Sequence, residues 1–311
     1  MSEIQTIRNV LTAIQDQVKE VVIGQDDVIE NLLIALLSNG HVLVEGVPGL
    51  AKTLLVKTMA ETLNCSFNRI QFTPDLMPSD VTGTKIFDSK SGEFYVKKGP
   101  VFSNIILADE INRAPPKTQS SLLECMQEKQ VTIDVESFKI PEPFYVFATQ
   151  NPIEQEGTYP LPEAQVDRFL MKLVISYPER VKEEEILSKY GRNETQQVRK
   201  VADPQDIIRA QEFAKKIRST KPITTYILDL VEKTRNHMDV MLGLSTRAAL
   251  HLLMASKAKA LLSGRNYVTD FDVKSVAPHV MRHRIMLKPE ASLDRHVEDI
   301  VKEVIDETPV P

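Results

Sequence analysis

Apolar residues recur along the chain with two different spacings, and the change between them divides the sequence. Over residues 1–22 and 26–38 they return every three or four positions, as in amphipathic helices. Short apolar runs then alternate with helical stretches up to about residue 180. We expect strands at 42–45, 68–72, 104–108, 144–149 and 171–175, with helices at 52–63 and about 115–128. This alternation predicts an α/β fold with a parallel sheet and helices on both of its faces.

Two segments interrupt the alternation of strands and helices, and a third region contains helices only. Residues 84–96 and 130–140 each have the pattern of an inserted β-hairpin, the first with a Ser-Gly turn. Such projections usually contact something, although shielding of a sheet edge is a simpler explanation. Beyond residue 180 we expect helices alone, at 181–191, 203–219, 222–238, 245–263, 269–283 and 290–306. The predicted domains are an α/β core at 1–180, a linker at 181–200 and an all-α domain at 201–311.

Composition narrows the class of protein. The chain has 311 residues, 42% of them hydrophobic, which is enough for two domains with substantial cores. Its net charge of −5 argues against a protein built to coat nucleic acid, although residues 241–288 alone carry +6. Cys65 and Cys125 are the only cysteines and suggest reduced thiols. With acidic residues from Glu3 onward and no apolar run of about 20 residues, we expect a cytoplasmic protein without a signal peptide or membrane insertion.

The segment that follows the 42–45 strand has the pattern of a nucleotide phosphate-binding loop. Gly46 and Gly49 allow a tight turn in which successive backbone N–H groups face phosphate oxygens. Lys52 opens the next helix, where the helix dipole also favours an anion, and its ammonium should reach the terminal phosphates. The Thr53 hydroxyl is suited to ligate Mg²⁺. An ordinary turn between strand and helix is the alternative.

One position of this loop departs from the usual pattern. Glycine ordinarily precedes the lysine, and here the residue is Ala51. Its methyl group requires a backbone angle that an L-residue tolerates, so we expect a slightly altered loop.

Two adjacent carboxylates end the 104–108 strand. Because strand side chains alternate between faces, Asp109 and Glu110 are expected to do different jobs. Asp109 is suited to hold Mg²⁺ directly or through water, and Glu110 to orient and deprotonate the water that attacks the γ-phosphorus. An acidic turn after a buried strand is common by itself, but a lysine loop upstream favours ATP binding and hydrolysis.

Three further residues are candidates for the same chemistry. Asn151, after the 144–149 strand, could hydrogen-bond the γ-phosphate and the attacking water, although Asn-Pro also forms plain turns. Arg168 is expected at a helix end. Arg247 is expected at a helix N-terminus, where a buried cation is unfavourable unless an anion lies nearby. Taken singly, both arginines would most often be solvated surface residues.

Taken together, these residues closely resemble the MoxR family of AAA+ ATPases, whose relatives are the magnesium chelatase ATPase subunit and the MCM helicases. Three segments carry the resemblance, which extends over nearly the whole chain: residues 45–53, 109–114 and 161–169. Alanine at position 51 is familiar within that family. The resemblance implies a P-loop AAA+ core followed by a helical lid, with ATP and Mg²⁺ as cofactors. It also implies a hexameric ring that acts as a chaperone-like maturation factor for partners such as proteins with von Willebrand factor A domains.

The resemblance also assigns roles to individual residues. Asn151 corresponds to sensor 1, Arg168 to an arginine finger offered to a neighbouring subunit, and Arg247 to sensor 2. The adenine pocket would be lined by Val22, Ile23 and Gly24. The loop and first helical turn that would hold the phosphates comprise Gly46, Val47, Pro48, Gly49, Leu50, Ala51, Lys52, Thr53 and Leu54. The 84–96 hairpin resembles the helix-2 insert of this clade, and 131–140 resembles its hairpin before sensor 1.

Three other functions stay open at this point. A nucleic-acid motor could use the basic stretch 241–288 and the hairpins, but the acidic total charge and the absence of Trp make nucleic acid an unlikely partner. A metallochelatase motor would need a chelatase integrator partner. A nucleotide-gated scaffold would bind ATP and barely hydrolyse it.

Two further groups of residues have simpler interpretations. His279 and His283 stand four positions apart on an expected helix, and a surface or interface pair is favoured over a metal site. The methionines of the helical region are expected to fill its core: Met238, Met241, Met254, Met281 and Met286.

Overall fold

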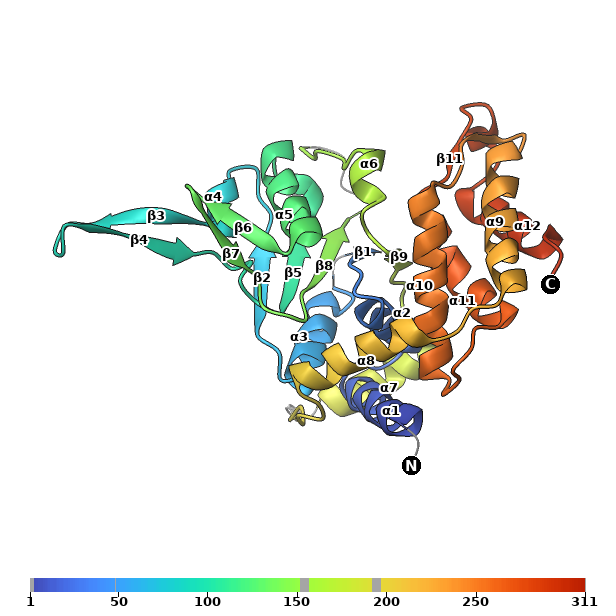
Figure 1. Ribbon diagram of the computed structural model, residues 1–311, viewed down its shortest axis with the longest axis horizontal. Helices are drawn as coiled ribbons and strands as arrows, with labels where there is room; N and C mark the ends of the chain where they lie inside the picture. The colour runs from blue at the N-terminus through green and yellow to red at the C-terminus, as the bar shows by residue number, and fades with distance from the viewer. Residues whose placement is uncertain (1–2, 48, 152–156, 192–196, 311) are drawn as a thin grey trace.

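The computed structural model describes residues 3–47, 49–151, 157–191 and 197–310. Its central sheet has five parallel strands in the order β2-β5-β8-β1-β9 (Figure 1). The strands are β1 (Val42–Glu45), β2 (Phe67–Gln71), β5 (Ile105–Asp109), β8 (Tyr145–Gln150) and β9 (Met171–Val174). The five expected strands are confirmed, each to within one residue at either end.

Alternation of side chains along the strands divides the core into two layers. Val42 and Val44 face a cluster of buried residues contributed by α1 (Glu3–Val21), α2 (Asp26–Leu37) and α3 (Lys52–Thr62). Leu43 faces the opposite layer, which contains α4 (Pro78–Thr82) and α5 (Pro116–Glu128). Both faces of the sheet are therefore covered, which explains why the inner strands β1, β5 and β8 are largely apolar, whereas the edge strand β2 carries the exposed polar residues Asn68 and Arg69.

Both expected hairpins are confirmed. The first consists of β3 (Gly83–Asp88) and β4 (Glu93–Lys98), and the second of β6 (Gln130–Ile133) and β7 (Glu136–Lys139). The first projects far from the body of the protein (Figure 1). An ion pair of 3.1 Å between Lys85 and Asp134 connects the two hairpins.

The helical lid packs against α1, α2 and the edge strand β9. Its helices are α8 (Pro204–Lys216), α9 (Lys221–Asn236), α10 (Thr246–Leu262), α11 (Asp270–Met281) and α12 (Val297–Glu307). Buried apolar residues of these helices form one continuous cluster with those of α1, α2 and α3. Lid and core therefore share a hydrophobic interior.

The expectation of helices alone beyond residue 180 was wrong in two places. Strands β10 (Val240–Leu242) and β11 (Met286–Leu287) form a short antiparallel ribbon in the lid. The helix expected at 290–306 is divided into a 3-10 turn, η2 (Ala291–Leu293), and α12. The Asp299 carboxylate accepts the His296 backbone N–H at 2.9 Å and so caps the start of a new helix.

The expected role of the lid methionines was wrong for three of the five. Met238, Met241 and Met254 are 78%, 56% and 41% exposed, whereas Met281 is fully buried. The periodicity of the helices does not distinguish a Met that fills a core from one that lies on the surface.

His279 of α11 and His283, two residues beyond the end of that helix, face the core from the lid, which fits the interface alternative of the prediction and not an exposed surface pair. His279 Nε2 lies 3.2 Å from Asn31 of α2, and His283 Nε2 lies 3.2 Å from the Phe169 carbonyl. Both side chains are half-buried at the junction of lid and core. Nothing in the described residues groups them with a third metal-binding side chain.

Candidate functional site

The loop between β1 and α3 lies where the carboxyl ends of the parallel strands meet, which we call the carboxyl edge of the sheet. Gly46 packs closely on β9, since a Cβ built there would lie 3.0 Å from the Ile175 carbonyl oxygen. Gly49 has a φ of +87° and open space around its Cβ position. Lys52 begins α3, and its ammonium donates to the Gly46 carbonyl at 2.7 Å. The loop thus bends around the position of the Lys52 ammonium, as a phosphate cradle requires.

Ala51 keeps a conformation that glycine adopts more readily. Its φ of +53° and ψ of +22° lie in the left-handed region. An L-residue is tolerated there at a cost of about 1 kcal/mol. The alanine is therefore accommodated by local strain, and the positive φ is retained. Pro48 lies outside the described residues.

The electrostatic surroundings of Lys52 suit an anionic ligand. Partial burial lowers the pKa of Lys52, and the carboxylates of Asp109 and Glu110 oppose that shift. Lys52 is therefore a partly desolvated cation beside two carboxylates. Phosphate oxygens together with a divalent cation would balance these charges.

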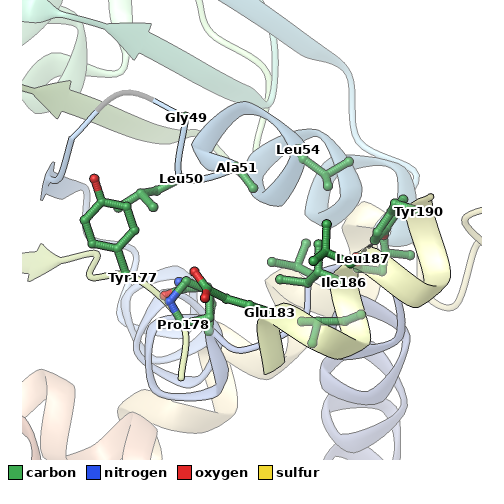
Figure 2. Close-up of a pocket in the computed structure, with 14 residues that line it drawn as sticks. Gly49, Leu50, Ala51, Leu54, Tyr177, Pro178, Glu183, Ile186, Leu187 and Tyr190 are labelled. Carbon is green, nitrogen blue, oxygen red and sulfur yellow. Dashed lines mark hydrogen bonds between the residues drawn. The ribbon is translucent and has the colours of Figure 1, made fainter. Parts of the chain in front are cut away.

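An apolar pocket of about 630 Å³ adjoins the loop (Figure 2). Six residues of the expected site line it with predominantly apolar surface: Val22, Ile23, Gly49, Leu50, Ala51 and Leu54. Such a pocket fits a flat heterocyclic base next to the phosphate loop. Gly24 has a different role. A Cβ there would lie 2.9 Å from Pro178, so Gly24 permits close packing behind the pocket.

The other wall of this pocket comes from residues that sequence reasoning missed. Helix α7 (Arg180–Tyr190) matches the helix expected at 181–191 and overlaps the predicted linker at 181–200, and it contributes Glu183, Ile186, Leu187 and Tyr190 (Figure 2). The Tyr190 hydroxyl donates to the Val21 carbonyl, which holds α7 against α1. No residue of α7 is fully buried, and its apolar positions make no clear stripe. The only available signal was the Ile186, Leu187 and Tyr190 group at helical spacing.

Asp109 and Glu110 lie at the same edge of the sheet, on the far side of β8. Asp109 forms an ion pair with Arg69 at 2.6 Å and accepts the Thr149 hydroxyl at 2.6 Å. Glu110 accepts the Gln71 side-chain amide at 2.7 Å. The strand ends at Asp109, and Glu110 has a φ of +56°. Its direction therefore follows from the turn into η1 (Ile111–Arg113), and strand alternation does not apply to it.

The residues of this edge fit ATP and Mg²⁺. Hydroxyl and carboxylate oxygens are the ligands that Mg²⁺ prefers, and Thr53 and Asp109 supply one of each. Thr53 is half-buried on the first turn of α3, directly after Lys52. Val47 is half-buried and follows Gly46 in the loop. Asn151 is buried and follows the last residue of β8, so it lies on the same edge.

Arg168 lies at the opposite edge of the sheet, where the amino ends of the strands meet; we call this the amino edge. Its neighbour Leu170 donates a backbone N–H to the His41 carbonyl at 2.8 Å, directly before β1 begins. Met171 then pairs with Val42, at the amino end of that strand. The four residues of β1, at about 3.3 Å each, separate this position from the phosphate loop. The structure therefore does not bring Arg168 to Lys52 of its own chain.

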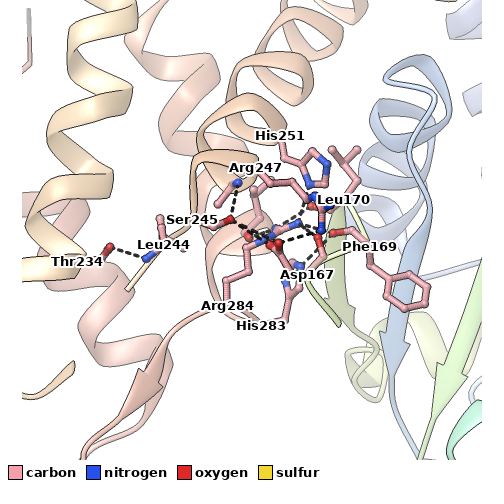
Figure 3. A network of polar contacts seen from close by, with 12 residues as sticks. Asp167, Phe169, Leu170, Thr234, Leu244, Ser245, Arg247, His251, His283 and Arg284 are labelled. Carbon is pink, nitrogen blue, oxygen red and sulfur yellow. Dashed lines mark hydrogen bonds and ion pairs between the residues drawn. The ribbon is translucent and has the colours of Figure 1, made fainter. Parts of the chain in front are cut away.

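Arg247 lies at this opposite edge too, and its counter-anion is a carboxylate. Its guanidinium lies 3.2 Å from Asp167, the residue before Arg168 (Figure 3). Ser245 caps α10, accepting the Ala248 N–H at 3.2 Å, and its hydroxyl also points to Asp167. The anion near Arg247 thus comes from its own chain, and the guanidinium is 45% exposed, so the premise of a buried cation does not hold.

Comparison with known proteins identifies the family of this chain. Residues 41–171 match the family described as ATPase family associated with various cellular activities (AAA), and residues 232–304 match an AAA lid domain. The chaperone MoxR1 of Mycobacterium tuberculosis is 46% identical, covering 92% of this chain and 78% of that protein. The protein MoxR of Methylorubrum extorquens is 30% identical, covering 98% of this chain and 96% of that protein. The chain belongs to the MoxR family of AAA ATPases.

A solved structure extends this result to the fold. A crystal structure from Cytophaga hutchinsonii, described as a candidate ATPase, has a TM-score of 0.93 and 44% identity. It covers 99% of this chain, and this chain covers 97% of it. The match to the AAA ATPase family spans Lys52, Asp109, Glu110 and Arg168, and the match to the AAA lid domain spans Arg247. Among the described residues, no helix has the length and apolarity needed to cross a membrane.

Proposed function

We propose that this MoxR-family protein hydrolyses ATP as a ring of identical copies, with each active site shared between two neighbours. The observation that carries the proposal is the placement of Lys52 and Arg168 at opposite edges of one sheet. Among the described residues, Arg168 has no ion-pair partner in its own chain. A half-buried guanidinium in that situation is available to an anion on another molecule.

Within one chain, the residues of the carboxyl edge would bind the nucleotide. Lys52 and the backbone N–H groups of Gly49 and Ala51 would hold the phosphates, and the apolar pocket would take the base. Thr53 and Asp109 would hold Mg²⁺, which neutralises charge on the phosphates when bound. Glu110 would accept a proton from the attacking water, and Asn151 would orient that water.

The neighbouring chain would complete the site with its amino edge. Arg168 would approach the γ-phosphoryl group and stabilise the charge that develops there. Because Arg247 is tied to Asp167 beside Arg168, we propose that Arg247 also acts on the neighbour's nucleotide. This assignment places sensor 2 in trans, a choice that the sequence leaves open.

Mixing two inactive variants tests the shared site. Arg168→Ala keeps its phosphate loop, and Lys52→Ala keeps its arginine, so some interfaces of a mixed ring pair an intact loop with an intact arginine. We expect ATPase activity that neither variant has alone. If the two variants never complement each other at concentrations where rings form, Arg168 does not act between chains and the shared-site mechanism fails.

The output of the cycle is proposed from family resemblance. We propose a hexameric, chaperone-like factor in the cytoplasm that remodels or matures partner proteins, with von Willebrand factor A domain proteins as candidate partners. Capture of partners from the native host with the ATP-bound and ADP-bound forms tests this proposal. A nucleotide-dependent set of proteins without such domains would remove that partner class.

A nucleic-acid motor is the main alternative, and the packing of the basic stretch disfavours it. Four of its eight cations are already in ion pairs: Arg247 and Arg284 with Asp167, Lys259 with Glu30, and Arg265 with Asp272. We expect DNA and RNA to leave the ATPase rate unchanged. Stimulation by single-stranded DNA, with affinity that falls steeply as salt rises, would favour the motor.

Two further alternatives have simple discriminators. A metallochelatase motor would require an integrator partner among the captured proteins. A nucleotide-gated scaffold would bind ATP but show no turnover in a steady-state assay, even when rings form.

A further inference from the structure

Arg284 of the lid is inserted beside the turn that carries Arg168. Its side chain is only 2% exposed, and burial lowers its pKa to about 10. The guanidinium donates to the backbone carbonyls of Asp167, Phe169 and Leu170, which flank Arg168 on both sides (Figure 3). Residues before and after Arg168 are thereby fixed by a single side chain from a distant part of the sequence.

The Asp167 carboxylate joins this arrangement to the second arginine. One oxygen accepts from Arg284 Nε at 2.7 Å, and the other lies 3.2 Å from Arg247 Nη1. Asp167 therefore bridges α10 of the lid, through Arg247, and the segment after α11, through Arg284. The Asp167 carboxylate belongs to the turn that carries Arg168, and it binds the guanidinium of Arg247. Arg168 and Arg247 are therefore held in a fixed position relative to each other.

The loop that precedes α10 is fixed as well. The Leu244 N–H donates to the Thr234 hydroxyl at 3.1 Å (Figure 3). The Leu244 carbonyl accepts from Arg235 Nε at 2.8 Å. Gly243 lies so close to α9 that a Cβ there would be 2.8 Å from the Arg235 backbone. Arg247 thus belongs to a rigid part of the lid, and a rotation of the lid would move Asp167 and its turn with it.

We propose that Asp167, held by Arg284, is the positioning residue that sets Arg168 and Arg247 in the orientation in which a neighbouring copy meets them. The inference rests on the proposed shared site. In addition, the position of the lid determines where both arginines lie. Among the described residues, the ion pairs of Asp167 with Arg247 and Arg284 are the only ones that join the Arg168 turn to the lid.

Asp167→Asn is the informative substitution. It keeps the side-chain shape and an acceptor for Arg284 but removes the charge that holds Arg247. The matched control is Lys259→Gln, which breaks the 2.6 Å ion pair between α10 and Glu30 of α2. That ion pair also joins lid to core, yet it touches neither arginine.

The test introduces Asp167→Asn into only one of the two chains that form each shared site. In mixtures of Lys52→Ala and Arg168→Ala chains, the Lys52→Ala chain donates the arginines and the Arg168→Ala chain supplies the phosphate loop. We expect Asp167→Asn on the donor chain to lower the recovered ATPase activity roughly tenfold or more, since small misplacements of catalytic groups have effects of that size. The same substitution on the acceptor chain, and Lys259→Gln on either chain, should leave the activity within about twofold of the unmodified mixture.

The outcomes distinguish the two proposals. Equal losses from Asp167→Asn on both chains, or no loss on the donor, would overturn the positioning role while the shared site stands. Absence of activity in the unmodified mixture would overturn the shared site and this inference together. ATP affinity of the acceptor chain, measured by calorimetry, should not change in any mixture, and a change there would identify a structural effect instead.

Discussion

The carboxyl edge of the sheet and its amino edge carry different charged groups, and those groups are held in different ways. At the carboxyl edge, Asp109 and Glu110 are bound by Arg69, Gln71 and Thr149, which belong to neighbouring strands of the same sheet. At the amino edge, Asp167 is bound by Arg247 and Arg284, which follow it by 80 and 117 residues and belong to the lid. The first edge is therefore complete within the core, whereas the second depends on how the lid is docked.

This difference has a functional meaning. A site whose acid and lysine are fixed by the sheet can bind nucleotide in a single chain. A site whose arginines are fixed by the lid can respond to lid movement, and in the proposed ring it would present them to a neighbouring copy. The two edges would thus separate binding from activation of hydrolysis.

The largest expected effect concerns chemistry at the carboxyl edge. Glu110→Gln keeps the shape of the side chain and leaves Asp109 in place but removes the base, so turnover should fall by roughly 100- to 10,000-fold. ATP should still bind, and the ring should be stabilised. Steady-state ATPase assays measure this, with the exposed Glu124→Gln as control. Near-normal hydrolysis would place the catalytic carboxylate elsewhere.

Lys52→Ala sharpens the comparison by removing the cation of the same edge. ATP affinity should fall by on the order of 100-fold, because hydrogen bonds to a charged group are lost and the loop N–H donors alone cannot compensate the phosphate charge. Isothermal calorimetry measures the change. Lys57→Ala, on the same helix but exposed and paired with Glu61, should bind ATP normally. Unchanged affinity in Lys52→Ala would contradict the phosphate-loop assignment.

Acidification should affect the amino edge first, because three histidines lie there. Burial lowers the pKa of His41 to about 4 and that of His251 to about 3, and it lowers the pKa of His283 as well. Each must stay neutral in the native state, whereas the unfolded chain takes up its proton below about pH 6.5. Stability is therefore lost as pH falls from about 6.5 toward 4, by about 1.4 kcal/mol per pH unit for each histidine.

Urea unfolding at pH 7 and pH 5 checks this expectation. His251→Gln keeps an acceptor for Arg284 and should reduce the pH dependence, whereas the exposed His296→Gln should leave it unchanged. Equal pH dependence in all three proteins would show that these histidines do not govern acid stability.

The smallest effect concerns strain in the phosphate loop. Ala51→Gly should relieve the left-handed conformation and raise the free energy of unfolding by at most about 1 kcal/mol. Ala60→Gly, in the interior of the helix α3 that follows this loop, should lower the free energy of unfolding by at least about 1 kcal/mol. Denaturant titration of the two variants compares the signs. A loss of stability in Ala51→Gly would mean that the strain is absent.

The sequence by itself determined the sheet, both hairpins, the order of the helices and the residues of the carboxyl edge. These features rest on local signals, because strand and helix spacing is periodic and the glycines, Lys52 and the carboxylates follow their strands directly. Their roles in catalysis remain predictions until the variants are measured. Local signals also misled in the lid, where strands β10 and β11 are only three and two residues long.

Tertiary structure alone decided which residues meet across long separations. It placed α7 on the apolar pocket beside the β1–α3 loop, although nothing in residues 180–190 marks a binding segment. It also gave Arg247 a carboxylate partner 80 residues away and put Arg284 beside the turn of Arg168. Such contacts depend on how the lid docks on β9 and α2, and that docking follows from the shape of a shared apolar core, which no short stretch of sequence encodes.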